Sequence, residues 1–591
     1  MATKRRDFLK AATIGSAVAL TGGCDGNGEV DIAPRLSGAK PGDDRAAPIS
    51  VNTIAEAEKL QGVSYTDSER RQMLHGLERK LEQWAVLRAE TPANSAPPAQ
   101  VFSPKLPRQR IRSQKNRFSF YELQREPFSE MRFPEAPEDI AYADVKTLGA
   151  MVRAGVLTSA ALTEIYLQRI ERYNPTLRAF ITVSADLARE QAEKADKDFA
   201  KGRDRGPLHG IPYAVKDIID TRNIPTTWGA ALYRDRVPDK DAEVVVKLKR
   251  AGAVLLGKTS CGALAYGDQW FDGRTRNPWN PKEGANGSSA GSAAAVVAGL
   301  CGFALGTETL GSIISPSERC GAVGLRPTFG RVTRAGVMTL AWSLDKVGPL
   351  ARRAEDTAAV LSALNGYDAD DPAAARMGFT YDGGVDLSSL TVGYVPAWFE
   401  AGDETDRTAL AAVRDSGVRM VEFDWPARRF DALIEIVQVE AAAAFADLTL
   451  SGEDDALAWQ EEAAWPNTWR AARFVSAVDY VQIDRLRRQL MTDLAEAFNG
   501  VDVLIGPHFA GGALLATNCT GHPQMAVPVG STQTPSRDLW DAPIVAGAGE
   551  TFQTPRGVSL WGALFNEGPM IAVARALETA LGVSSRRPPG F

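Results

Sequence analysis

The chain has 591 residues, which is longer than one ordinary core requires and leaves room for a large α/β domain with smaller additions. Its net charge is only −6, and Lys and Arg do not cluster as they do on a nucleic-acid-binding face. The five cysteines lack CxxC spacing and nearby histidine pairs. Composition therefore argues against a nucleic-acid partner, a zinc site and a disulfide framework.

Residues 1–24 have the layout of an export signal. The charged segment KRRDFLK at residues 4–10 precedes a short, weakly apolar run that ends in small residues. Arg5 and Arg6 followed by DFLK resemble the twin-arginine signal, which exports folded proteins. We therefore expect a periplasmic protein, or one anchored to the outer side of the bacterial inner membrane. The alternative is a basic helical N-terminus.

Cys24 raises the question of a lipid anchor. Gly22 and Gly23 precede it, as at a lipoprotein cleavage site, whereas Thr21 stands where such sites usually carry an aliphatic residue. Membrane anchoring through a lipid on Cys24 and an unmodified Cys24 both remain open. The other cysteines do not argue against export, because a folded passenger forms its thiols in the reducing cytosol.

The N-terminal part divides into three segments after the signal. Residues 25–50 are rich in Gly, Pro, Asp and Ala and predict a flexible linker. Residues 51–135 predict a helical region with a Pro-rich extended stretch at 91–107. Thr66 and Glu69 form a capping box ahead of an apolar stripe. The stripe consists of Leu74, Leu77, Leu81 and Trp84. We expect it to pack on the main domain, with partner binding as the alternative.

Residues 136–591 alternate between helical and strand patterns. Buried strands are expected at 178–183, 253–257, 390–395 and 502–506, and a helix at 404–416 is closed by Gly417. This alternation predicts an α/β fold with a single large sheet that helices cover on both faces.

Residues 287–314 combine serines with an absence of bases. The segment holds one Glu and no Asp, His, Lys or Arg. Ser288 and Ser289 stand before an Ala-rich helical pattern, and Ser312 follows the expected strand GFALG. A serine in such a turn is a candidate nucleophile, because backbone N–H groups of Thr309, Leu310 and Gly311 could form an oxyanion hole.

The base for such a serine must come from another segment. The GxSxG elbow of Ser-His-Asp hydrolases is absent. Lys216 follows the apolar run IPYAV, and burial would keep a lysine neutral by disfavouring its charged form. We expect a buried lysine at a strand end, and a surface lysine beside Asp217 is the alternative.

Three ordered motifs carry a resemblance to the amidase signature family. They are GIPYAVKD around Lys216, NGSSAGSAAAVVAGL at 286–300 and LGTETLGS at 305–312. Further similarity at 320–337 and 343–358 extends the resemblance over most of residues 136–591. It implies the amidase signature fold, in which a single large mixed sheet is covered by helices on both faces.

The resemblance also implies a Ser, cis-Ser, Lys triad. Ser312 would be the acylated nucleophile, Ser288 the bridging serine held by a cis peptide, and Lys216 the ultimate base. The implied oxyanion hole is formed by the backbone N–H groups of Thr309, Leu310, Gly311 and Ser312. Ser289 is a candidate substrate-binding residue, although we favour a structural role for Ser289 and Ser292.

The activity implied by the family is hydrolysis of a carboxamide to a carboxylate and an amine or ammonia, through an acyl-enzyme. It requires neither a metal nor an organic cofactor, and the partner is a small-molecule amide. Two alternatives are the A subunit of a tRNA-dependent amidotransferase and a non-catalytic exported binding protein on the same fold. The twin-arginine pattern argues against the amidotransferase, which is a cytosolic assembly.

The sequence departs from the common family pattern in the nucleophile turn. Where the family has Asp-x-Gly-Gly-Ser-Ile-Arg, this chain has Glu308, Leu310 and Ile314, and Ala290 replaces a glycine of the GSSGG motif. If the replaced turn glycine needs a positive φ, Leu310 is strained; otherwise it narrows the pocket. We expect these changes to affect substrate choice and oxyanion-hole geometry more than the reaction.

Two histidines and one aromatic segment are further candidates. His209 and His522 lie among Pro and Gly, so we favour loop hydrogen bonding over catalysis for both. The stretch at 454–474, rich in Trp and acidic residues, predicts either a substrate-pocket wall or an amphipathic surface helix.

Overall fold

The computed structural model describes residues 49–89, 91–120, 132–537 and 550–591. The expected export signal, Cys24 and all but the last two residues of the expected linker lie outside the described residues. Almost all of the described chain belongs to one unit, Val51–Phe591. None of the described helices combines the length and apolar character needed to cross a bilayer.

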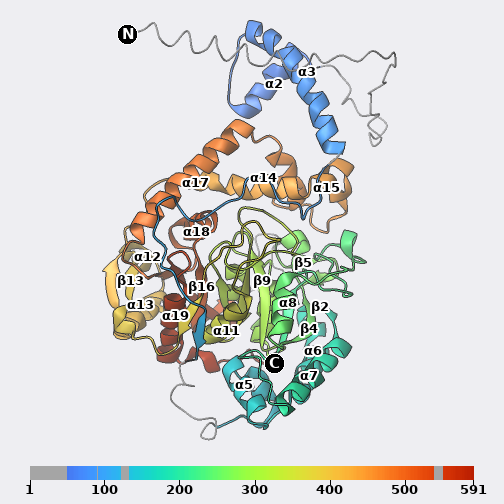
Figure 1. Ribbon diagram of the computed structural model, residues 1–591. Helices are drawn as coiled ribbons and strands as arrows, with labels where there is room; N and C mark the ends of the chain where they lie inside the picture. The colour runs from blue at the N-terminus through green and yellow to red at the C-terminus, as the bar shows by residue number, and fades with distance from the viewer. Residues whose placement is uncertain (1–48, 90, 121–131, 538–549) are drawn as a thin grey trace. The chain divides into compact units, whose positions relative to one another are not determined.

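Within the described residues, eleven strands form one large sheet (Figure 1). From edge to edge they are β14 (Arg419–Glu422), β13 (Thr391–Tyr394), β15 (Val503–Pro507), β17 (Thr551–Gly562), β16 (Gln524–Pro535), β10 (Val323–Arg326), β11 (Lys346–Ala351), β9 (Phe303–Glu308), β3 (Pro212–Lys216), β4 (Val254–Thr259) and β2 (Phe180–Val183). β3 runs parallel to both β4 and β9, whereas β9, β11, β10, β16 and β17 are successively antiparallel. The expected single large mixed sheet is confirmed.

Helices flank this sheet, as Figure 1 shows. The helices after residue 136 are α4 (Pro137–Tyr142), α5 (Val145–Arg153), α6 (Ser159–Leu177), α7 (Ala185–Ala200), α8 (Glu243–Arg250), α9 (Ala290–Val297), α10 (Ile314–Cys320), α11 (Ala354–Leu364), α12 (Pro396–Glu400), α13 (Glu404–Asp415), α14 (Ile434–Ala444), α15 (Ala446–Ser451), α16 (Trp465–Ala472), α17 (Ala477–Ala497), α18 (Ala513–Thr520) and α19 (Glu567–Leu581). Every residue of α9 is buried, because its alanines let it pack closely against β9, β3 and β4.

The elements expected from the sequence pattern are present. The four expected strands correspond to β2, β4, β13 and β15. The expected helix is α13, and Gly417, which follows its end, has a positive φ. The strand GFALG lies in β9, and Lys216 is the last residue of β3. Short continuous apolar runs and helical spacing are therefore a sound guide to these elements.

The N-terminal helices differ from expectation in their packing. The helices are α2 (Val51–Gln61) and α3 (Asp67–Ala89), and the Thr66–Glu69 capping box is present, with Thr66 N donating to Glu69 Oε2 at 2.7 Å. None of the described residues of α3 is buried, however, and Leu81 and Trp84 are 44% and 43% exposed. The expectation that this stripe packs on the main domain was wrong for Leu81 and Trp84, because helical spacing shows which face is apolar but not whether another element covers it.

Residues 91–119, here called the strap, lead from the N-terminal helices across the main domain. Figure 1 draws the strap as the blue trace that passes α14 and α18 and ends in the short strand β1 (Arg117–Ser119). β1 pairs in parallel with β12 (Thr380–Asp382). The Pro-rich composition of the strap suits an extended segment that lies on a surface without forming a helix.

Candidate active site

Lys216 lies at the end of β3 and is completely buried. Its Nζ donates hydrogen bonds to Ser288 Oγ at 2.7 Å and to Thr307 Oγ1 at 2.9 Å. Burial lowers the pKa of Lys216 to about 8, although the nearby thiol of Cys261 and the carboxylates of Asp345 and Glu308 oppose this shift. Roughly a tenth of the side chain is therefore a neutral amine at pH 7, far more than for an exposed lysine.

Asp217 does not neutralise Lys216. Its carboxylate accepts hydrogen bonds from the backbone N–H of Thr227 at 2.9 Å and from the Thr227 hydroxyl. Burial raises the pKa of Asp217 to about 6. The alternative of a surface lysine beside Asp217 is thus contradicted: both residues are buried, and the Asp217 carboxylate is bonded to Thr227.

Ser288 and Ser289 occupy the turn that leads into α9. The peptide bond between Gly287 and Ser288 is cis, and only 1% of Ser288 is exposed. Ser289 Oγ donates to Thr307 O at 3.1 Å and accepts from Thr307 N at 3.2 Å, so its hydroxyl is bonded to the backbone of β9. Substrate binding by Ser289 stays a prediction. Ser292 also bonds to β9, through Leu305 O at 2.9 Å.

Ser312 follows β9 in the next turn. Its carbonyl oxygen accepts a hydrogen bond from Ser289 N at 3.0 Å, which holds the two serine-bearing turns together. Ser312 is 8% exposed. Among the hydrogen bonds of the described residues, the Lys216–Ser288 contact is present, but none joins the side chains of Ser288 and Ser312.

The nucleophile turn places the expected oxyanion-hole residues as follows. Gly311 has φ +82°, whereas Leu310 is not among the described residues with positive φ. Leu310 is therefore unstrained, and its partly buried side chain packs against a hydrophobic cluster. Within the described part of the chain, no acceptor bonds to the backbone N–H of Leu310, Gly311 or Ser312.

Glu308 holds the nucleophile turn in place by hydrogen bonds, a role that the sequence analysis did not identify. Its Oε2 accepts from the backbone N–H groups of Ile313 at 2.8 Å and Ile314 at 3.0 Å. Its Oε1 accepts from Arg326 at 2.6 Å and from Asn518 at 2.9 Å. Burial raises the pKa of Glu308, but the Arg326 charge and these bonds outweigh it, so the pKa lies below its ordinary value. A lone carboxylate in an apolar segment is the signal that could have indicated such a network.

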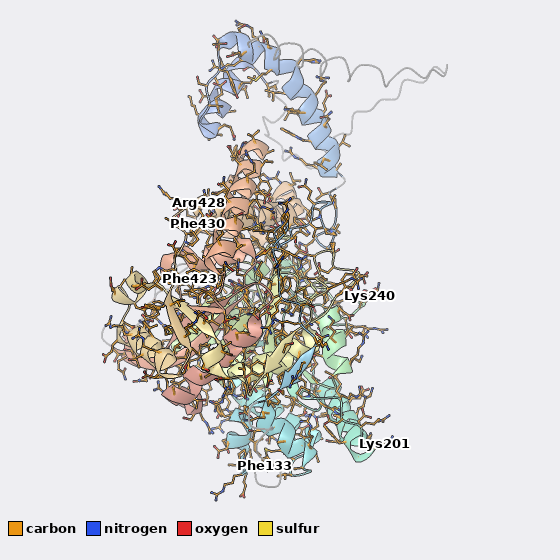
Figure 2. The ribbon with its side chains drawn as sticks, turned by 60° about the vertical axis from the view of Figure 1, so that its left-hand side comes forward. Phe133, Lys201, Lys240, Phe423, Arg428 and Phe430 are labelled. Atoms are coloured by element: carbon orange, nitrogen blue, oxygen red, sulfur yellow. The ribbon has the colours of Figure 1, made fainter. Side chains whose placement is uncertain are left out.

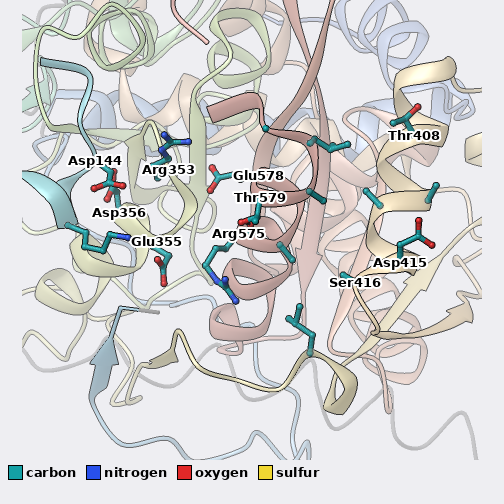
Figure 3. A pocket seen from close by; sticks show the side chains of 18 of the residues that line it. Asp144, Arg353, Glu355, Asp356, Thr408, Asp415, Ser416, Arg575, Glu578 and Thr579 are labelled. Atoms are coloured by element: carbon teal, nitrogen blue, oxygen red, sulfur yellow. The ribbon is translucent and has the colours of Figure 1, made fainter. Parts of the chain in front are cut away.

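A cavity of about 340 Å³ lies beside Thr307, the residue that accepts a hydrogen bond from Lys216. Thr307 and Thr309 line it from β9 and the following turn. Its apolar wall consists of Ile218, Ala265, Val337, Met338, Leu340 and Trp342. A larger cavity, of about 950 Å³, lies between α5, α11, α13 and α19 (Figure 3), but Lys216, Ser288 and Ser312 do not line it. The same three residues do not line the smaller cavity either, but its lining residue Thr307 is hydrogen-bonded to Lys216, which makes it the cavity adjacent to the candidate site.

The remaining candidates are His209, His522 and the stretch 454–474, and their contacts support the fold. His209 is buried against the Phe199 ring, and His522 Nδ1 lies 2.9 Å from Thr520 Oγ1. Burial lowers the pKa of His522 to about 3. In the stretch 454–474, Trp465 is buried in α16 and donates from Nε1 to Leu264 O at 3.0 Å. It packs in the cluster that includes Ile218 and Met338, so this stretch supports the cavity wall.

The mixed sheet and the ordered motifs around Lys216, Ser288 and Ser312 define an amidohydrolase. The profile of the amidase family matches residues 161–568. The chain therefore belongs to the amidase family, whose members with this fold cleave C–N amide bonds.

Individual relatives support this assignment. The chain is 33% identical over 475 residues to a putative amidase, AmiD, of Mycobacterium tuberculosis, a match that covers 77% of this chain and 98% of the relative. It is 32% identical over 480 residues to the GatA chain of the glutamyl-tRNA(Gln) amidotransferase of Anaeromyxobacter dehalogenans, covering 75% and 97%. The solved structure of a peptide amidase from Stenotrophomonas maltophilia aligns with a TM-score of 0.64 and 30% identity, covering 76% and 99%.

Proposed function

We propose that this amidase cleaves its substrate through an acyl-enzyme on Ser312, with Ser288 bridging to the base Lys216. The observation that carries the proposal is the 2.7 Å contact between the buried Lys216 amine and Ser288 Oγ. The neutral amine takes the proton of Ser288, Ser288 takes that of Ser312, and Ser312 Oγ attacks the amide carbonyl. The relay then returns a proton to the leaving amine, and water hydrolyses the acyl-enzyme.

The proposed oxyanion hole uses the backbone N–H groups of Thr309, Leu310, Gly311 and Ser312. The tetrahedral intermediate places a negative charge on the former carbonyl oxygen, and fixed donors around it lower the barrier without reorganisation. The turn is held by Glu308, whose carboxylate accepts hydrogen bonds from the backbone N–H groups of Ile313 and Ile314, the two residues after Ser312. The Thr307 hydroxyl accepts one hydrogen of the Lys216 amine and thereby orients its lone pair.

Labelling with a fluorophosphonate probe tests the proposal. Wild-type protein is expected to take up one probe per chain, and Ser312→Ala is expected to take up none. Ser292→Ala is the matched control, because Ser292 lies in the same segment but bonds to the backbone of β9. Undiminished labelling of Ser312→Ala would contradict the assignment of the nucleophile.

A second candidate function comes from the relatives that belong to tRNA-dependent amidotransferases. Such a chain would release ammonia from an amide donor for transfer to a charged tRNA, in an assembly with partner chains. Purified chain that hydrolyses simple carboxamides without added protein supports the free amidase. Activity that appears only with partner chains and tRNA would favour the amidotransferase.

We also propose that the chain is exported by its twin-arginine-type signal, with Cys24 as a candidate lipid anchor. The support is the order of Arg5, Arg6, the short apolar run and the Gly-Gly-Cys sequence. Replacing both arginines by lysine is expected to leave the protein in the cytosol. A Cys24→Ser variant that moves from the membrane to the soluble periplasmic fraction would support lipidation, and unchanged fractionation would contradict it.

A further inference from the structure

Two threonines that line the cavity of about 340 Å³ place it next to the proposed relay. Thr307 lines the cavity and accepts the hydrogen bond from Lys216 Nζ at 2.9 Å. Thr309 lines it as well, three residues before Ser312, and its hydroxyl donates to Asp345 at 2.5 Å. A group that occupies the cavity therefore lies next to the reacting residues.

One wall of the cavity is apolar and firmly held, and the side chains of Asp345 and the buried Lys346 line the cavity as well. Ile218, Ala265, Met338 and Leu340 line it and belong to one buried cluster with Trp465. The backbone N–H of Leu340 donates to Asp345 at 2.8 Å, which fixes that part of the wall. Close packing behind the wall leaves it little freedom to widen.

The rim of the cavity is polar. Lys240 lies there at the surface of the molecule, as Figure 2 shows, and Asp241 and Asp370 line the same rim. A cavity with one apolar wall and several polar groups suits a side group of limited size.

The strap forms the outer wall of this cavity through Ser95 and Pro97. Asn94 fixes this part of the strap: its Nδ2 donates to Thr339 O at 2.8 Å and Ala444 O at 3.2 Å, and its Oδ1 accepts from Thr339 N at 2.9 Å. The side-chain amide thus bonds to both backbone groups of a residue that itself lines the cavity.

Further along, the strap is anchored independently of the cavity. The centroid of the Phe102 ring lies 5.1 Å from that of Phe329, and the Arg487 guanidinium lies 3.4 Å from the centroid of the Phe102 ring. Gln114 Nε2 donates to Phe565 O at 3.0 Å. These contacts make the strap a fixed wall. The strap also precedes residue 161, where the match to the amidase family begins.

We propose that this cavity is the subsite for one side group of the amide substrate, and that Ser95 and Pro97 of the strap set the largest group it accepts. The inference rests on the proposed function, since it takes the adjacent relay as the reacting centre. It assigns the size limit to a segment that lies outside the matched family region.

Ligand binding to the Ser312→Ala variant tests the subsite without requiring turnover. Dissociation constants are measured by calorimetry for two series: primary amides with acyl chains from acetyl to octanoyl, and acetamides with N-substituents from methyl to benzyl. In the Ser312→Ala background, Pro97→Trp is expected to weaken the larger members of one series about tenfold or more, because the larger side chain takes up the space that they need. The smallest members are expected to bind as before.

Ala96→Trp is the matched control, since Ala96 is exposed between the two wall residues and does not line the cavity. It is expected to leave both series unchanged. Asn94→Ala removes the clamp and is expected to bring the affinities of large and small amides closer together. Equal effects of Pro97→Trp and Ala96→Trp, or equal weakening of every amide by Pro97→Trp, would overturn the inference. Turnover by unaltered Ser312 tests the proposed chemistry separately.

Discussion

At the scale of single residues, Glu308 combines a structural and a functional role. It is the only acidic residue in 287–314, and it bonds to the turn after Ser312 as well as to Arg326. Both members of this ion pair are fully buried. Removing one charge would leave the other buried and unpaired, which is more costly than the pair itself contributes.

Glu308→Gln is therefore expected to lower the free energy of unfolding by about 3–5 kcal/mol, as measured in denaturant. The catalytic rate of the folded fraction is expected to fall as well, because the turn loses its anchor. Glu56→Gln is the matched control: its partner Lys59 and Glu56 itself are about 70% exposed, and exposed pairs contribute little. Equal losses in the two variants would contradict the role given to Glu308.

Replacing Gly311 tests whether the geometry of the nucleophile turn affects activity beyond its effect on stability. With φ +82°, a side chain there is strained, and its Cβ would lie 2.9 Å from Ser315 Oγ. Gly311→Ala is expected to cost about 1–2 kcal/mol of stability and to lower kcat about 100-fold, since it displaces an oxyanion donor. Gly500 has φ +81° and open space around it. Gly500→Ala should therefore lose similar stability but retain full activity.

Residue identity at the site was predictable where a local motif carried it. Lys216, Ser288 and Ser312 stand in three ordered motifs, and the structure brings Lys216 and Ser288 into contact. The partners of Glu308 were not predictable, because Asn518 is 210 positions away in the sequence. Local patterns carry no information on which distant side chain fills a buried hydrogen-bonding position.

At the scale of elements, α3 and α16 carry tryptophans in opposite environments. Trp84 of α3 is 43% exposed, whereas Trp469 of α16 is fully buried. Trp84→Ala is expected to change the free energy of unfolding by less than about 0.5 kcal/mol, and Trp469→Ala to lower it by about 3–5 kcal/mol. Comparable losses in denaturant unfolding would mean that α3 is covered in solution.

Elements were predictable where the apolar pattern was clear, as in the continuous buried run of β4 and the amphipathic helix α13. The long hairpin of β16 and β17 was not identified, although it supplies two neighbouring strands of the sheet. Strand order also could not be derived. β17 lies between β15 and β16 through contacts that hydrophobic periodicity does not encode.

At the scale of the whole molecule, buried carboxyl groups predict the pH dependence of stability. Glu578 lies in the larger cavity region shown in Figure 3, and both of its oxygens accept from Ala354 N. Burial raises the pKa of Glu578 to about 8, against an ordinary value of 4.5. Between these two values the folded state holds a proton that the unfolded state releases, so stability falls as pH rises.

Glu578→Gln should remove this contribution. Between pH 5 and 8 its free energy of unfolding is expected to fall less steeply than that of the wild type, by up to about 1.4 kcal/mol per pH unit. Denaturant unfolding at several pH values measures the difference. Asp356 is also buried and its pKa is raised by burial, so a residual slope of the same sign should persist. Parallel curves for the two proteins would contradict the proton assigned to Glu578.

The central claim is that neutral Lys216 drives acylation of Ser312, and the pH dependence of the acylation rate tests it most directly. Stopped-flow measurement of the first turnover should give a rate that rises about tenfold per pH unit at low pH and levels off near 8, the pKa of Lys216. Lys216→Ala should fold but lose this rise and nearly all of the rate. A wild-type rate without a transition near pH 8, or an unchanged rate in Lys216→Ala, would contradict the account.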